Sequence, residues 1–187
     1  MRKNFYQLGL LALFLVLPAR AASLLIYEIE PIVGYERTQK LVPTRHTKDR
    51  LLYGARMTFG VPLIAGELEY TRATDNEDFP DDLLTTKDTE DRVKLGLKSQ
   101  IRLGATINAF ARAGGQASRN IHEETLNGVA SKVEEPIKYK PYAGAGFTGK
   151  LGRHYLFTAG ITVVFKEFPV MDKNEYQATA GFVVRFP

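Results

Sequence analysis

The last residues of the chain, 176–187, alternate between two kinds of side chain. The apolar and aromatic members are Tyr176, Ala178, Ala180, Phe182, Val184 and Phe186. Polar or small residues stand between them, with Val183 as the exception. A repeat of two residues is typical of a β-strand with two unlike faces. In a soluble sheet the apolar face turns to the core, whereas in a membrane barrel it turns to lipid.

Seven earlier runs show the same alternation and predict seven further strands. They cover residues 27–36, 51–60, 64–71, 93–103, 107–116, 138–148 and 155–166. The run at 107–116 is irregular, because Ala is a poor strand former and Phe110 stands among the polar members. Each run is close to the length that a tilted strand needs to cross a bilayer. We therefore expect eight strands.

The connections between these runs alternate in length. Long polar segments at 38–49, 75–91 and 118–136 alternate with short breaks at Pro62, at 104–105 and at 151–153, and a loop of intermediate length covers 167–173. Outer-membrane barrels have short periplasmic turns and longer extracellular loops. The sequence therefore predicts an all-β fold, an eight-stranded antiparallel up-and-down transmembrane β-barrel. A soluble exported barrel of the lipocalin type is the alternative.

Aromatic residues on the apolar faces are expected at two levels of such a barrel. Near the periplasmic edge they are Tyr27, Phe59, Phe147, Tyr155, Phe157 and Phe186, and near the outer edge Tyr35, Tyr53, Tyr70, Tyr139, Phe165 and Tyr176. Aromatic side chains favour membrane interfaces, where one end of the ring meets hydrocarbon and the other end meets water. This placement favours the membrane barrel over the soluble one.

The first residues resemble a cleavable export signal. Arg2 and Lys3 precede an apolar run from Leu8 to Leu17 that is too short to span a bilayer, and Ala19-Arg20-Ala21 follows as a small-x-small cleavage site. We expect a signal peptide at 1–22 and one barrel domain at 23–187, with a membrane anchor as the alternative for the first segment. The chain has no Cys, which excludes disulfides and a lipoprotein signal.

Two stretches resemble the small OmpA- and OmpX-like outer-membrane barrels. Residues 141–147, Pro-Tyr-Ala-Gly-Ala-Gly-Phe, are similar to the Gly-rich late strands of that group. The chain end is similar to its barrel-assembly signal, carried here by Thr179, Gly181, Val184 and Phe186. It departs at Val184, where an aromatic residue is usual, and at Pro187. The resemblance implies outer-membrane lipid, lipopolysaccharide and the barrel-assembly machinery as surroundings and partners.

The polar faces of the strands should point into the barrel. Acidic and basic residues fall on neighbouring strands, and adjacent strands can supply the pairs that buried charges require. The sequence predicts an interior ion-pair network of Glu28, Glu30, Glu36, Arg56, Glu67, Glu69, Lys94, Lys98, Arg102, Arg112 and Arg185. We interpret it as a filling of the barrel interior, which is just wide enough for side chains. A narrow hydrated pore lined by charge is the alternative.

The sequence contains no convincing catalytic or metal-binding arrangement. The three histidines, His46, His122 and His154, fall on different connections. Some small outer-membrane barrels modify lipid A, and His122 with Ser118 or Ser131 is the one combination that fits such chemistry. We expect a monomer without a cofactor that is not an enzyme. Neither a nucleic-acid motif nor a basic amphipathic helix is evident, so nucleic acid is not an expected partner.

Charged residues near the outer rim suggest contacts to lipopolysaccharide. Arg45, Lys48 and Arg72, together with Arg92, could bind its phosphates, and acidic loop residues could bind bridging divalent cations. The first functional hypothesis is a structural or surface-interaction role through the outer loops. The alternatives are a narrow pore for small solutes and a lipid A-modifying enzyme.

Overall fold

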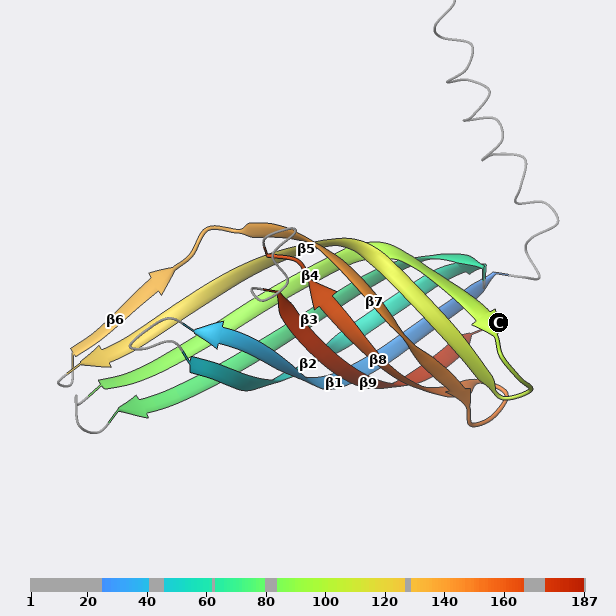
Figure 1. Cartoon of the computed structure of the whole chain (residues 1–187), viewed down its shortest axis with the longest axis horizontal. Helices are drawn as coiled ribbons and strands as arrows, with labels where there is room; N and C mark the ends of the chain where they lie inside the picture. The colour runs from blue at the N-terminus through green and yellow to red at the C-terminus, as the bar shows by residue number, and fades with distance from the viewer. Residues whose placement is uncertain are drawn as a thin grey trace, which may run out of the picture.

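A computed structural model describes residues 25–40, 46–61, 63–79, 84–126, 129–166 and 174–186. The strands are β1 (Ile26–Lys40), β2 (His46–Val61), β3 (Ile64–Phe79), β4 (Leu84–Arg102), β5 (Ile107–Leu126), β6 (Val129–Glu134), β7 (Lys138–Lys150), β8 (Tyr155–Val164) and β9 (Glu175–Phe186) (Figure 1). The described part of the chain contains no helix that is long and apolar enough to span a membrane. The expected signal peptide at 1–22 and Pro187 lie outside the described residues.

The strands form a closed barrel in which each pairs antiparallel with its neighbours. Around the ring the order is β4, β3, β2, β1, β9, β8, β7 and β5, and a β4–β5 pairing closes it. At the seam between β1 and β9, Tyr27 lies opposite Phe186 and Arg37 lies opposite Tyr176. β6 pairs with the C-terminal part of β5 (121–126) outside this ring. The prediction of an eight-stranded antiparallel barrel is confirmed.

The prediction of long outer loops was wrong in large part, because much of each expected loop is strand. β3 continues to Phe79, β4 begins at Leu84 and β5 continues to Leu126, with Asp75 opposite Asp88. Once the lipid-facing parts of the strands have set the register, the hydrogen-bond ladder can continue beyond them toward the connections β1–β2, β3–β4 and β5–β6. Beyond the lipid-facing band the outer face of these segments meets water, so its residues need not be apolar. The two-residue pattern therefore could not reveal them.

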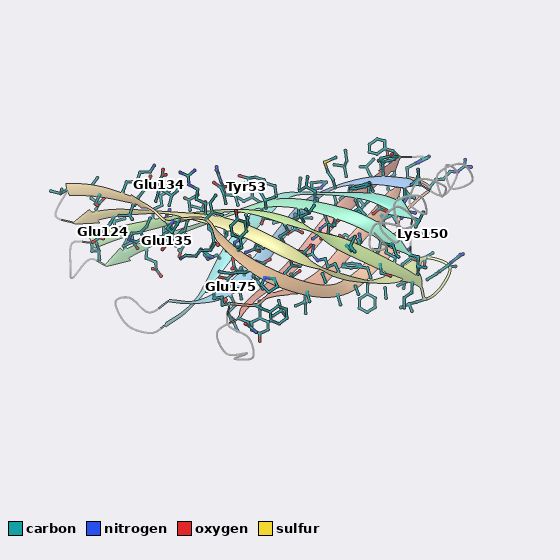
Figure 2. All side chains as sticks on the ribbon, turned by 90° about the horizontal axis from the view of Figure 1, so that it is seen from above. Tyr53, Glu124, Glu134, Glu135, Lys150 and Glu175 are labelled. Carbon is teal, nitrogen blue, oxygen red and sulfur yellow. The ribbon has the colours of Figure 1, made fainter. Side chains whose placement is uncertain are left out.

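The barrel is taller on one side than on the other. β3, β4 and β5 have 16, 19 and 20 residues, whereas β7, β8 and β9 have 13, 10 and 12. The upper parts of β3, β4 and β5 (75–79, 84–90 and 119–126) therefore extend past the shorter wall together with β6, and we call them the protruding sheet (Figure 1). In Figure 2 Glu124 and Glu134 mark this end, and Lys150 marks the opposite end.

The outer surface is apolar around the ring. Eleven of the twelve aromatic residues expected on the lipid-facing side are exposed, and Phe165 is half-buried. Tyr27 lies opposite both Phe59 and Phe186, which places these three rings at one level. Between the two aromatic levels lie exposed aliphatic residues such as Leu68 and Leu95, which face each other. Such a band suits hydrocarbon, because exposure of this much apolar surface to water is unfavourable.

A charge placed in this band should destabilise the barrel in a bilayer but not at the protruding sheet. We expect Leu95→Arg to lower the free energy of unfolding by about 2–4 kcal/mol in phospholipid vesicles, the cost of Arg near a bilayer midplane. Val133→Arg is the matched control, because Val133 is also exposed but lies on β6. Urea titration of both variants measures the difference. Equal losses would contradict a lipid-facing Leu95.

Candidate functional site

The interior of the barrel holds nearly balanced opposite charges. Nine acidic side chains are buried on the inward faces of the strands: Glu28, Glu30, Glu36, Glu67, Glu69, Asp75, Asp88, Glu90 and Glu175, of which Asp75, Asp88 and Glu90 come from the protruding sheet. The buried basic side chains are Arg50, Arg56, Arg92, Lys94, Lys98 and Arg112. Lys140, Lys166 and Arg185 are partly exposed and pair with buried acids from the two ends. The barrel therefore encloses ion pairs rather than a charge of one sign.

A central cluster lies at mid-height and consists of Glu30, Arg56, Glu67, Glu69, Lys94 and Arg112. The Glu69 carboxylate accepts hydrogen bonds from three cations: Nε of Arg56 at 2.8 Å, Nζ of Lys94 at 2.6 Å and Nη1 of Arg112 at 2.6 Å. Arg56 also contacts Glu30 at 2.9 Å. Because these residues come from β1 to β5, the cluster ties five strands across the interior.

A lower pair lies beside the seam that closes the barrel. Nη2 of Arg185 on β9 is 2.5 Å from Oε1 of Glu28 on β1, and Nζ of Lys98 on β4 is 3.7 Å from the other carboxylate oxygen. The ammonium group of Lys98 also lies 5.0 Å from the centre of the Phe110 ring. Such a position over an aromatic face is favourable for a cation. The first, fourth and last barrel strands are thus joined by one carboxylate.

Arg102 was wrongly assigned to the interior network. Its side chain is exposed, and its Nε donates to the carbonyl oxygen of Gly104 at 2.9 Å. β4 ends at Arg102, so this residue stands where the chain turns and the side chain is no longer enclosed by neighbouring strands. The other ten predicted network residues form ion pairs inside the barrel.

An upper cluster contains residues that sequence reasoning missed or misplaced. Nη1 of Arg92 lies 2.6 Å from Glu36, and Nη2 of Arg50 lies 2.7 Å from Glu90. The expectation that Arg92 binds lipopolysaccharide at the rim was wrong, because its side chain is fully buried in this cluster. Arg50 and Glu90 share the alternation of the inward faces of β2 and β4. Extending that alternation past Leu51 and Val93 would have found them.

Two aromatic side chains fill the interior between the ion pairs. The Tyr142 hydroxyl donates to Glu67 at 3.3 Å, and its ring lies 5.8 Å from both Lys94 Nζ and the guanidinium carbon of Arg112. Phe110, the irregular member of its run, is also buried. A Cβ at Gly146 would lie 2.6 Å from the Phe110 ring, so a glycine is needed there. This packing explains why the stretch at 141–147 is rich in glycine.

The residues of the predicted assembly signal divide between the two faces of β9. Thr179 and Gly181 face the interior, whereas Val184 is half-buried and Phe186 is exposed on the outer face. A Cβ at Gly181 would lie 2.2 Å from Oε1 of Glu30, which pairs with Arg56. Gly181 thus has a packing role in the interior. Recognition by the assembly machinery stays a prediction.

The predicted rim residues are only partly described. Arg72 forms two hydrogen bonds with Asp91, at 2.7 and 2.9 Å, and Asp91 also accepts one from the Tyr70 hydroxyl at 2.7 Å. Arg45 and the side chain of Lys48 lie outside the described residues. Higher up, hydrogen bonds from Arg37 hold the pKa of the Asp49 carboxyl below its usual range. Binding of lipopolysaccharide stays a prediction.

His122 lies on the protruding sheet and contacts acidic residues. Its Nδ1 lies 2.7 Å from Oδ1 of Asp88, and its Nε2 lies 3.8 Å from Glu124. Ser118 is four residues away on the same strand, about 13 Å along it. Ser131 pairs across the strands with Glu124. Among the described residues there is no group of three or more His, Asp or Glu side chains that could hold a metal ion.

The closed antiparallel ring, its apolar exterior and its charged interior define an eight-stranded transmembrane β-barrel. No family model and no curated protein sequence matches this chain. Solved structures match it closely in shape. Neisserial surface protein A has a TM-score of 0.64 at 13% identity, covering 86% of this chain and 97% of that one.

Two further solved structures share the shape of this chain. A major outer membrane protein from Thermus thermophilus gives a TM-score of 0.59 at 10% identity, covering 87% of this chain and 99% of that one. Ail, the attachment invasion locus protein of Yersinia pestis, gives 0.57 at 13% identity over 86% and 99%. At this identity the likeness concerns the fold. The resemblance to small OmpA- and OmpX-like barrels is confirmed at that level.

The central cluster should be essential for stability, in contrast to ion pairs on the surface. We expect Glu69→Gln to lower the free energy of unfolding by about 3–5 kcal/mol, because it leaves three buried cations short of a carboxylate. Urea unfolding of the barrel in vesicles measures this loss. Asp49→Asn is the control, since the side chains of Asp49 and its partner Arg37 are 54% and 67% exposed. We expect no measurable change there, and similar losses in both variants would argue against the network.

Proposed function

We propose that this protein resides in the bacterial outer membrane and acts without catalysis, as a filled barrel that presents the protruding sheet outside the cell for interaction. The asymmetry of the barrel carries this proposal. The strands of one wall continue well beyond the band that suits lipid, whereas those of the other wall end near it. Extending several strands beyond the membrane adds nothing to the anchoring of a barrel, so a role for this sheet outside the membrane is favoured.

The protruding sheet has features of an interaction surface. All six residues of β6 are exposed, among them Val129 at 72% and Val133 at 55%. In the described part of the chain β6 pairs along one edge, with β5. An open strand edge offers backbone N–H and C=O groups to which another strand can bind. Exposed valines beside that edge could provide apolar contacts for such a partner.

Two of the similar structures are named for surface roles. One is a neisserial surface protein, and the other is an attachment invasion locus protein determined in complex with the heparin analogue sucrose octasulfate. These names support a surface role for the same kind of barrel. The many acidic residues of the protruding sheet here, such as Glu124 and Glu134, favour a partner other than a sulfated polyanion, because like charges repel.

The interior favours a barrel that does not conduct. The ion pairs of the central cluster reach across the barrel from several strands, and their side chains are at most 3% exposed. An ion that passed through would have to displace these paired charges, which are costly to separate in a buried place. The narrow pore for small solutes is the second candidate, favoured by the charged lining.

The proposed topology can be tested with single cysteines, because the chain has none of its own. We expect Ser131→Cys on β6 to react with a membrane-impermeant maleimide on intact cells. Ala105→Cys, in the exposed turn between β4 and β5, should react only after the outer membrane is permeabilised. Labelling measured by gel shift distinguishes the two. The reverse pattern, or release of the protein by mild salt, would refute the proposal.

The filled interior can be tested by electrical recording. Pure folded protein in planar bilayers should give no steady, reproducible conductance, because the central cluster occupies the interior at mid-height. Replacement of two members, as in Arg56→Ala with Arg112→Ala, should allow ions to pass if the variant folds, which heat-dependent gel mobility verifies. Steady conductance of the unaltered protein would favour the pore instead.

A further inference from the structure

The outer surface of the barrel carries a groove at the end opposite the protruding sheet. It has a volume of about 550 Å³, and its lining includes Gly104, Thr106, Phe147, Gly149, Phe157 and Ala159. Phe147 lies opposite Ala159, and Phe157 lies opposite Gly149. Each ring thus stands beside a small residue, and the lack of side-chain volume at the small residues leaves a depression between β5, β7 and β8. A Cβ at Gly149 would have no atom within 4 Å.

Basic residues occur in the two turns next to this groove. The guanidinium group of Arg102 donates to the carbonyl oxygen of Gly104, and the backbone N–H of Lys150 donates to that of Thr106 at 2.8 Å. The Arg102 guanidinium therefore lies beside the lining, and the backbone of Lys150 is bonded to it. Arg153 is exposed in the adjacent turn. The two turns, 102–106 and 150–154, contain no acidic residue.

We propose that this groove binds an anionic phospholipid of the periplasmic leaflet, with an acyl chain against the phenylalanine rings and the phosphate beside Arg102 and Lys150. The inference rests on the proposed function in so far as the barrel lies in a bilayer. An apolar groove at this level is filled by hydrocarbon. The basic rim adds selectivity, because Arg and Lys bind phosphate through charge-assisted hydrogen bonds.

The position of the groove along the barrel fits this ligand. Tyr155 and Phe157 belong to the lower aromatic level, where lipid headgroups meet hydrocarbon. Lys150 lies at this end of the barrel in Figure 2, far from Glu124 and Glu134. A free phosphate ion would use the basic rim but not the apolar lining. The groove and the rim together require a ligand that is both apolar and anionic.

The selectivity can be measured on the full folded chain in detergent. We expect native mass spectrometry to show one bound phosphatidylglycerol per barrel, retained about tenfold more strongly than phosphatidylcholine with the same acyl chains. Two cations near an anionic lipid surface contribute at most about thirtyfold, and tenfold lies within that range. Equal retention of the two lipids would overturn the proposal, since a groove filled by any neighbouring lipid shows no headgroup preference.

Two pairs of variants separate the groove from its rim. Gly149→Phe should fill the groove and abolish the retained lipid, whereas Gly115→Phe is the matched control, because Gly115 is lipid-facing and equally open but lies outside the groove. Arg102→Gln with Lys150→Gln should remove the preference for phosphatidylglycerol. Arg119→Gln with Lys132→Gln removes the same charge from the protruding sheet and should leave the preference intact.

The outcomes distinguish this proposal from the proposed function. If the cysteine labelling succeeds but retention is equal for both lipids, or the two members of a pair behave alike, the lipid site is refuted and the outer-membrane barrel stands. If the unaltered protein shows no heat-dependent gel mobility and no surface labelling, the proposed function itself fails. Should Gly149→Phe fail to fold, the rim variants decide, because Arg102 and Lys150 are exposed and outside the packed interior.

Discussion

Hydrocarbon offers no hydrogen-bond partner to a backbone N–H or C=O group, and this constraint governs the whole structure. The strands satisfy it by pairing around a complete ring, in which β1 and β9 join the two ends of the chain. With the ring closed, the chain has two kinds of surface to fill. The outer one faces lipid and takes apolar side chains. The inner one is enclosed by the ladder and receives every alternate residue.

The enclosed residues are charged, and this makes pairing obligatory. A buried ion without a partner costs several kcal/mol, so each inward carboxylate must meet a cation from another strand. Glu69 meets three such cations, and Glu28 on the first strand meets Arg185 on the last strand and Lys98 on the fourth. Gly146 makes room for the Phe110 ring and Gly96 for the Tyr142 side chain between these pairs. The ion pairs, the aromatic rings between them and the glycines beside the rings therefore depend on one another.

The same alternation explains which parts of the site were predictable. Glu30, Arg56 and Glu67 are found inside because each lies within a run bounded by apolar residues that face lipid. Arg92 was misplaced because its run loses its apolar members above Val93, where the outer face meets water instead of lipid. Arg102 was misplaced for the opposite reason. The alternation continues to it, but the neighbouring strands no longer enclose it. The position of a residue in the two-residue alternation assigns its side chain to the inner or the outer face. Where the neighbouring strands end decides whether that side chain is buried.

The sequence by itself determined the strands that cross the membrane, their two faces and the aromatic levels, because contact with lipid on one side imposes a repeat of two residues. Only the tertiary structure decided which acid meets which base, since one carboxylate can reach cations on several strands. It also decided that the polar segments above the membrane continue as sheet, because a ladder once in register extends without help from side chains. The groove near Arg102 likewise depends on cross-strand pairing, which puts Gly149 beside Phe157 and Ala159 beside Phe147.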